Sequence, residues 1–179
     1  MSTYETKKLM EIGYVKTGVR QYSGSKRYFS TGSIKRNSFI AEGEYTYENR
    51  PFRAHREIQD GDVIQARLQE TNKALLISKD FDGSLFSTGF MQFRCNKEEI
   101  IPKFLYYFLS SDLFLEQKNA LCSGSTQKAI NDKNLKNISL RIPALSVQKK
   151  IVEKLDAAFA DIDKLISATE KNIKNAQSI

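Results

Sequence analysis

Three residues are of the types that a metal-dependent nuclease uses. Glu116 and Lys118 form the E-x-K spacing of some of these enzymes, and Asp82 lies upstream as a third candidate. Such triplets are frequent by chance, and this one falls within a stretch that we expect to be helical. We therefore interpret Glu116 and Lys118 as members of a solvated helix face, with a metal-dependent nuclease kept as an alternative.

Other catalytic patterns are incomplete. Neither GxxxxGK[ST] nor GxGxxG occurs, so the sequence predicts no nucleotide-binding loop. The segment Asn49-Arg50-Pro51-Phe52 is close to the Asn-Pro-Pro-aromatic site of amino-methyltransferases, but Arg50 replaces a proline and no glycine-rich cofactor loop precedes it. His55 is the single histidine, which excludes a histidine-rich metal site, and the two cysteines lack CxxC spacing. These residues predict a binding protein with no catalytic site, metal or cofactor of its own.

The basic residues favour a polyanionic partner. The net charge is +7, and residues 16–36 hold six lysines and arginines with no acid among them. A second acid-free group, Arg50, Arg53 and Arg56, surrounds His55. Proteins that bind duplex DNA use lysine and arginine for phosphates, and arginine, asparagine, glutamine or serine for base edges. The clustering therefore predicts nucleic-acid binding, although solvated loop charges explain any single residue equally well.

We predict that several segments contribute to one DNA-binding surface. They carry basic, amide or hydroxyl side chains, and the glycines and serines beside them let the backbone approach a nucleic-acid strand closely. The predicted DNA-binding residues are Lys16, Arg20, Tyr22, Ser25, Lys26, Arg27, Asn49, Arg50, Arg53, Arg67, Asn72, Lys73, Ser125, Thr126 and Gln127. The last three belong to a loop whose backbone N–H groups suit a phosphate.

The C-terminal part predicts a long helix with an unpaired apolar seam. Its residues follow the strict four-three spacing of coiled-coil a and d positions. The predicted dimerisation residues are Ile151, Leu155, Ala158, Ile162, Leu165 and Thr169, and the spacing continues through Asn172, Ala176 and Ile179. A helix over 146–179 extends about 50 Å and needs a second helix beside it, from a partner or another copy. The alternative is an amphipathic helix packed on its own domain.

Residues 1–145 predict a globular domain of the mixed α/β class, which the helix 146–179 follows. We expect short strands within 1–36 and at 38–41, 63–67, 74–78, 85–95 and 138–142, with helices at 102–109 and at 112–121. The strand at 85–95 is expected to be central, because apolar groups occur on both of its faces. Ser110 to Asp112 and Ser146 are the expected helix caps.

Length and hydropathy set the remaining expectations. A chain of 179 residues is long enough for one domain with a real core plus an extension. No apolar run approaches the length of a membrane span, and no signal peptide is evident. We therefore expect a cytoplasmic protein without a membrane partner.

The chain also resembles a known family. Residues 102–107, 124–127, 135–138, 142–145 with Gln148, and 151–156 occur in an order and spacing similar to the end of the target-recognition domains of type I restriction–modification specificity (S) subunits. Gly61-Asp62-Val63-Ile64 matches the turn usual in that family, and Ala144 replaces its usual second proline. The resemblance covers roughly residues 60–166.

This resemblance implies a function and a set of partners. A complete S subunit has two such domains, each reading one half of a split double-stranded DNA target, and two conserved helices that pair as an antiparallel coiled coil. That coiled coil docks the methyltransferase (M) subunits. Adenine methylation with S-adenosylmethionine, and ATP-driven cleavage where a restriction (R) subunit joins, belong to the partners. The chain is then a half-subunit that forms a homodimer, or a fragment paired with a second half of S.

A dimeric, sequence-specific DNA-binding regulator is the main alternative. It would use the same charge and the same coiled coil, but no helix-turn-helix segment is evident. Dependence on an M subunit would separate the two functions. For that subunit we expect a docking surface on the exposed faces of the long helix, with Gln148, Lys149, Glu153 and Lys154 near its start.

Overall fold

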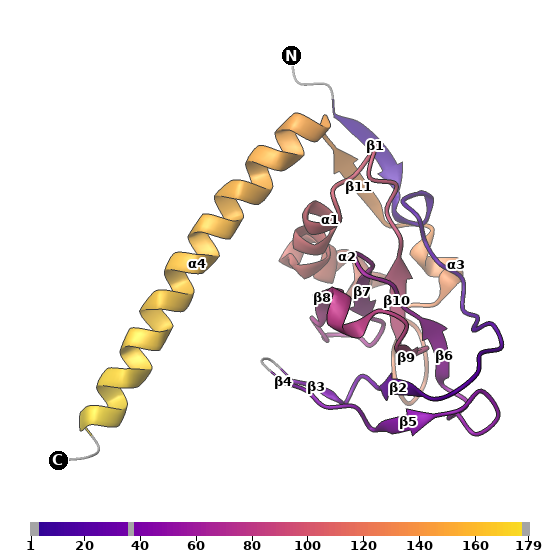
Figure 1. The fold of residues 1–179 in the computed structure, drawn as a ribbon. Helices are drawn as coiled ribbons and strands as arrows, with labels where there is room; N and C mark the ends of the chain where they lie inside the picture. The colour runs from indigo at the N-terminus through magenta and orange to yellow at the C-terminus, as the bar shows by residue number, and fades with distance from the viewer. Residues whose placement is uncertain (1–3, 36–37, 177–179) are drawn as a thin grey trace.

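Two small sheets and a pair of helices stack on one another, and a long helix projects from one end (Figure 1). The computed structural model describes residues 4–35 and 38–176. The strands are β1 (Glu5–Lys8), β2 (Lys26–Phe29), β3 (Ile34–Lys35), β4 (Ser38–Phe39), β5 (Gly43–Tyr45), β6 (Ala54–Glu57), β7 (Val63–Ala66), β8 (Ala74–Leu76), β9 (Leu85–Ser87), β10 (Phe90–Phe93) and β11 (Ser139–Ile142). The α-helices are α1 (Pro102–Ser110), α2 (Asp112–Leu121), α3 (Asp132–Leu135) and α4 (Leu145–Ala176), with 3-10 turns at Leu9–Glu11 and Lys79–Phe81. This arrangement confirms the predicted α/β class with a C-terminal helix.

Strand β7 lies at the centre of the core. It is the middle strand of the antiparallel sheet β10-β7-β8, and all four of its residues are buried. Val63 joins the apolar cluster beneath α1 and α2, while Ile64 joins the cluster shared with the second sheet, of order β5-β2-β9-β6. The preceding turn is formed as predicted, with Gly61 at a φ of +82° that glycine adopts at little cost. β7 therefore holds helices and sheets together.

The segment 85–95 is not the single central strand that the sequence predicts. It divides at Thr88 and Gly89 into β9, inside the four-stranded sheet, and β10, at the edge of the three-stranded sheet. The rings of Phe86 and Phe90 then meet between the two sheets, with centroids 5.8 Å apart. Apolar residues on both faces reflect this crossing from one sheet to the other.

The two helices that cover the sheet begin where the sequence predicts. Pro102 occupies the first position of α1, where its missing N–H costs no hydrogen bond. Ser111 caps α2, because its side-chain oxygen accepts a hydrogen bond from Phe114 N at 3.3 Å. α1 contacts both β7 and β8, so its buried face completes the larger apolar cluster.

One face of α4 is fastened to the body. The buried amide of Gln148 accepts a hydrogen bond from Ile101 N and donates to the carbonyls of Glu99 and Pro143, all at 2.9 Å. Val152 joins the core one turn later. Gln148 is therefore an anchor, and its expected place on an exposed docking face is wrong. The expected cap at Ser146 is also wrong, because α4 begins at Leu145 and Ala144 O accepts its first hydrogen bonds.

Two further contacts fix the direction of α4. Asp156 accepts hydrogen bonds from Lys103 Nζ at 2.8 Å and from the Tyr107 hydroxyl. The Phe159 ring stacks on that of Tyr107, with centroids 5.6 Å apart and an interplanar angle of 7°. These partners all come from α1, so the first four turns of α4 pack on their own body, as the amphipathic-helix alternative requires.

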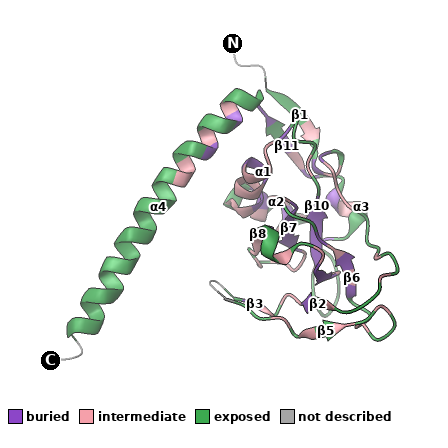
Figure 2. Ribbon diagram, in the orientation of Figure 1, coloured by how far each residue is buried: buried purple, intermediate pink, exposed green. Residues whose placement is uncertain are grey.

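Beyond these turns α4 is exposed on every side. All described residues from 157 to 176 are exposed (Figure 2). They include Ile162 and Leu165 of the predicted seam, at 47% and 68% exposure. Ile179 of the seam and Arg36 of the basic segment lie outside the described residues. Within the described part of the chain, no helix is long and apolar enough to cross a membrane.

Lys118 is a buried cation in this core. Its ammonium group donates hydrogen bonds to the carbonyls of Ala66, Leu68 and Thr71 at 3.3, 2.9 and 2.6 Å. Burial lowers the pKa of Lys118 to about 8. The side chain therefore ties α2 to the loop between β7 and β8.

The anchor of α4 predicts a measurable loss of stability. Gln148→Leu keeps the volume but leaves one buried N–H and two carbonyls without partners, so the free energy of unfolding should fall by about 2–4 kcal/mol. Urea denaturation measures this change, with Lys149→Leu at the next, exposed position as the control. Equal stabilities of the two variants would contradict the anchoring role.

Lys118 predicts a pH dependence of a definite sign. Below pH 8 this lysine is protonated in both states, whereas between about pH 8 and 10.5 the unfolded chain binds more protons than the folded one. Its contribution to stability therefore rises with pH in that window. Lys118→Met should remove the rise, so the stability difference between wild type and variant should grow from pH 7.5 to pH 10.

Urea denaturation across that pH range measures this difference. Tyrosines whose pKa burial raises, Tyr14 and Tyr28 among them, act in the opposite sense but equally in both proteins. Lys97→Met, which removes an exposed lysine, controls for the loss of one charge. Parallel pH profiles of wild type and Lys118→Met would refute the assignment.

Candidate nucleic-acid interface

The fold brings the two predicted basic segments together along β6. Gly18 N donates a hydrogen bond to His55 O at 3.0 Å, and Gly18 forms a β-bridge with Arg56. The segment that carries Lys16 and Arg20 therefore runs beside β6, and Arg53 immediately precedes that strand. Residues that are 30 to 40 positions apart in sequence thus share one edge of the molecule.

Arg56 supports this edge from inside. Its side chain is 1% exposed and donates hydrogen bonds to Val15 O at 3.0 Å and to Thr17 Oγ1 at 3.4 Å. Its Nε atom has no partner among the described residues. Burial and the nearby charge of Arg67 lower the pKa of Arg56. It acts as a positioning residue that holds segment 15–17 and does not line the surface.

The turn between β5 and β6 is held by aromatic contacts. The guanidinium of Arg50 lies 3.9 Å from the centroid of the Tyr47 ring and donates a hydrogen bond to Tyr47 O. Tyr22 packs edge-on against Tyr47 at 5.7 Å and donates from its hydroxyl to Tyr45 O at 2.9 Å. Burial raises the pKa of Tyr22. Tyr22 and Arg50, both predicted to bind DNA, therefore shape the turn.

The predicted cations differ in what their charge already contacts. Lys16, Arg20 and Arg53 are exposed, and within the described ranges none of them pairs with an acid. Lys26 instead forms an ion pair with Glu57 at 2.5 Å. Arg27 donates to Asp80 O and lies over the rings of two phenylalanines at 5.7–5.8 Å. The first three therefore have the positive charge most available to a ligand.

Arg67 is engaged within the protein. Its guanidinium donates to Asp132 Oδ1 at 2.7 Å, to the Tyr14 hydroxyl at 2.6 Å, and to the carbonyls of Ile130 and Phe90. Its side chain is 13% exposed. Tyr14 also donates to Asp132, and its hydroxyl together with Arg67 lowers the pKa of that carboxyl. The structure thus places Arg67 in an internal network.

Several predicted polar residues also have internal partners. Asn72 donates to Ser110 O at 2.8 Å, and Lys73 donates to Thr31 O at the same distance. Ser25 donates to Glu44 at 2.9 Å. Asn49 is exposed, and its side-chain oxygen accepts a hydrogen bond from Thr46. Of this group, Asn49 keeps the most capacity to bind a ligand.

The loop of Ser125, Thr126 and Gln127 is exposed and borders a shallow hollow. The other side of that hollow is residues 68–71 of the loop after β7. Gly124 has a φ of +135°, and a Cβ there would lie 2.5 Å from Gln127 O, so this turn requires glycine. These three residues lie on a separate loop, with no hydrogen bond to the β5–β6 turn among the described residues.

Of the residues around a hollow at the β5–β6 turn, the sequence prediction includes only Arg50. This hollow has a volume of about 600 Å³ and is lined by Thr17, Arg50, Pro51, Phe52, His55 and Thr88. Phe52 is 97% exposed. Its position between two arginines was the available signal, because an aromatic residue among cations is typical of nucleic-acid contacts.

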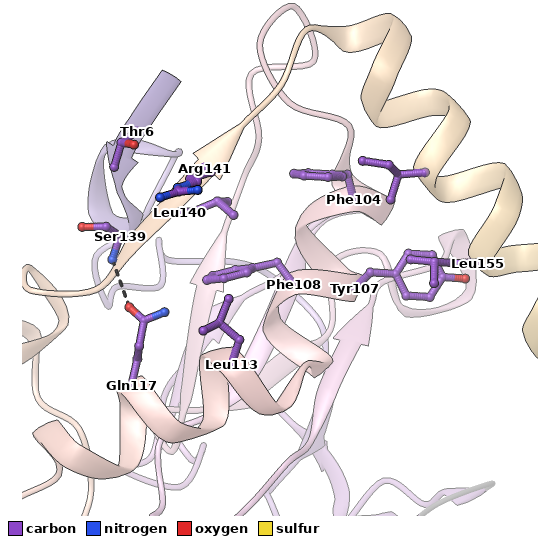
Figure 3. A pocket seen from close by; sticks show the side chains of 11 residues that line it. Thr6, Phe104, Tyr107, Phe108, Leu113, Gln117, Ser139, Leu140, Arg141 and Leu155 are labelled. Atoms are coloured by element: carbon purple, nitrogen blue, oxygen red, sulfur yellow. Dashed lines mark hydrogen bonds between the residues drawn. The ribbon is translucent and has the colours of Figure 1, made fainter. Parts of the chain in front are cut away.

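A second surface lies at the base of α4 (Figure 3). Ile151 and Leu155 of the predicted seam form one wall of an apolar groove of about 600 Å³. The opposite walls come from α1, α2 and β11, and include Phe104, Phe108 and Leu140. The seam is therefore continuous with an open apolar groove on the body.

The residues suggested for a nuclease do not form one site. Glu116 is exposed on α2, whereas Lys118, two residues on, points into the core. Asp82 accepts a hydrogen bond from Asp60 N at 3.1 Å. In the ranges that the structure describes, no three His, Cys, Asp or Glu side chains are grouped to hold a metal ion.

These features define an α/β protein with a basic edge and an unpaired helix. A family model described as the type I restriction modification DNA specificity domain matches residues 1–175. The chain belongs to this family, and the resemblance seen in residues 60–166 is confirmed.

Known relatives agree with this assignment. The HindI type I restriction enzyme specificity subunit of Haemophilus influenzae is 26% identical over 129 residues, which cover 70% of this chain and 28% of that protein. The StySPI specificity subunit of Salmonella potsdam is 29% identical over 100 residues, or 54% of this chain and 20% of that protein. The chain thus spans about a quarter of the length of these relatives.

Two solved structures share the fold. The HsdS subunit from Thermoanaerobacter tengcongensis has a TM-score of 0.74 at 26% identity, covering 90% of this chain and 43% of that one. A chain from a structure on complex assembly and conformational transition of the type I R-M system has a TM-score of 0.77 at 27% identity, with the same coverages.

Proposed function

We propose that this chain recognises one half of a bipartite DNA target for a type I restriction–modification system. The observation that carries the proposal is the family match over residues 1–175, which includes both the basic body and the helix. The available charges of Lys16, Arg20 and Arg53 support it, because phosphate contacts need unpaired cations. A free-standing regulator has no comparable support.

The division of labour follows from this proposal. The chain recognises and docks, while an M subunit transfers the methyl group from S-adenosylmethionine, and an R subunit, where present, cleaves with ATP. A complex that methylates DNA works where the DNA is, so we place the chain in the cytoplasm. The exposed Lys149, Glu153 and Lys154 near the start of α4 remain the proposed docking residues for M.

The seam of α4 supports antiparallel pairing with a second helix. Placing the twofold axis between Ile162 and Leu165 brings the seam residues from Ile151 to Ala176 opposite one another. The resulting pairs are Ile162 with Leu165, Ala158 with Thr169, Leu155 with Asn172, and Ile151 with Ala176. The end of the second helix then lies near the apolar groove at Ile151 and Leu155. The second helix comes from another copy, or from a second half of S.

The proposed function predicts site-specific methylation that requires both this chain and its M subunit. The purified chain, mixed with its M subunit and radiolabelled S-adenosylmethionine, should direct methyl transfer to adenine within an interrupted DNA sequence. The chain alone should label no DNA. Labelling by the isolated chain, or methylation by M with the same specificity in its absence, would refute the proposal.

The charges proposed to contact phosphate can be tested by measuring DNA-binding affinity over a range of salt concentrations. Lys16→Ala and Arg20→Ala should each weaken DNA binding for all sequences alike and reduce the slope of log K against log salt by about 0.9. Arg67→Lys disturbs only the internal network and serves as the comparison.

Homodimer formation is a separate prediction. Ile162→Glu combined with Leu165→Glu places charges at the centre of the seam and should convert the dimer to a monomer. The matched control is Ala160→Glu with Ser167→Glu, which adds the same charge on the opposite face of α4. Light scattering with sedimentation measures the mass. A monomeric wild type at high concentration, or a seam variant that still dimerises, would exclude self-pairing.

A further inference from the structure

Phe52 stands out by its surroundings as well as by its exposure. A single exposed apolar side chain is common on protein surfaces and indicates no site by itself. This ring, however, is 97% exposed on the wall of a hollow whose other members are mostly polar. Arg50 precedes it by two residues, and Arg53 follows it directly.

The turn that carries Phe52 is held in place before any ligand binds. Ala54 N donates to Pro51 O at 2.8 Å, and Thr88 N donates to Arg53 O at 2.9 Å, so the end of the turn next to β6 is tied. The stacking of Arg50 on Tyr47 fixes its middle. An ordered turn pays little conformational entropy on binding, which favours its use in recognition.

The chemistry around the ring indicates what it contacts. Among the described residues no carboxylate lines the hollow, and its polar lining comes from Thr17, Arg50, His55 and Thr88. In the part of the chain that the structure describes, Arg53 is exposed without an acidic partner, and the segment of Lys16 runs alongside. Glu48 is the one acid within the turn, and it is exposed. An apolar ring between cations suits a ligand that presents both phosphates and an apolar group.

Duplex DNA presents such a combination in its major groove. Of the four bases only thymine shows a methyl group there, and an apolar side chain such as phenylalanine recognises it by contact. A protein partner with an apolar patch is less well matched, because Phe52 has no large exposed apolar neighbour in the hollow.

We propose that Phe52 is a specificity-determining residue that contacts the 5-methyl group of one thymine in the half-target. Arg53 contacts a phosphate beside it, and Arg50 acts as a positioning residue for the turn. This inference rests on the proposed function, and it identifies one base of the target and the chemical group on that base that Phe52 recognises.

Thymine-to-uracil replacement tests the contact, because it removes only the methyl group. The preferred half-target is first selected from a random duplex library with the full-length wild-type chain. Each thymine of that target is then replaced by uracil in turn. Wild type should lose about fourfold in affinity at one position, the usual value of one buried methyl group.

The variants assign that loss to Phe52. Phe52→Ala should bind the thymine and uracil duplexes equally at this position, with the affinity of wild type for the uracil duplex. Ile40→Ala, which truncates another exposed apolar side chain just after β4, should keep the wild-type discrimination. Matching thermal unfolding curves of Phe52→Ala and wild type exclude a folding defect.

Each result decides between the two proposals. Discrimination by Phe52→Ala equal to that of wild type, or no thymine sensitive to uracil, would overturn the role of Phe52 while leaving sequence recognition intact. A wild-type chain that selects no sequence from the library would instead overturn the proposed function itself.

Discussion

The junction between α1 and α4 is the constraint on which the other features depend. Gln148, Val152, Asp156 and Phe159 face the body, and each has a specific partner there: backbone groups, the core, Lys103 and Tyr107. Because these contacts use one face of the helix over four turns, they fix its direction. They also place Ile151 and Leu155, where the seam begins, along the open apolar groove between α4 and α1. A helix joined to the body by a flexible segment would carry the same residues but would have no fixed direction relative to the body.

The basic edge depends on the same kind of support. Arg56 is buried, and its guanidinium group donates hydrogen bonds to Val15 O and Thr17. Arg67 likewise donates hydrogen bonds to Asp132 and to backbone carbonyls. These two arginines stabilise the segments beside them, and so the neighbouring cations can remain exposed and unpaired. Burying a charge is costly unless hydrogen bonds compensate, and among the described residues the Nε atom of Arg56 has no partner. Buried arginines thus position the neighbouring segments, while other, exposed arginines are available to contact DNA.

Local signals were sufficient for much of the fold. The turn at Gly61, strand β7, helices α1 and α2, and the seam spacing of α4 all follow from patterns within a few residues. The segment 85–95 was misassigned because its alternation continues through Thr88 and Gly89, where the chain leaves one sheet for the other. The periodicity of the segment indicates that both of its faces are buried, but it does not indicate that the segment divides between two sheets.

The roles of individual cationic residues could not be predicted from the sequence, because they depend on tertiary contacts. Arg53 and Arg67 are equivalent in the sequence, yet Asp132, 65 residues away, engages only Arg67. Lys118 likewise reads as part of a solvated face until three carbonyls of another loop surround it. Phe52 was visible in the sequence, but its recognition as a candidate needed the hollow that the β5–β6 turn forms with Thr17 and Thr88.

The order of contacts along α4 has a consequence for pairing. In the proposed antiparallel arrangement, Leu155 lies opposite Asn172 and Ile151 lies opposite Ala176, while Ala158 lies opposite Thr169. Only Ile162 and Leu165 meet as a large pair, at the centre. A polar residue at a seam position lowers stability but favours one register. The centre therefore supplies most of the attraction and the ends define the alignment. Since each body is fixed to its own helix by the α1 junction, that alignment would set the distance between two DNA-reading edges. Rigid attachment and defined register are both necessary for recognising two half-targets at a constant spacing.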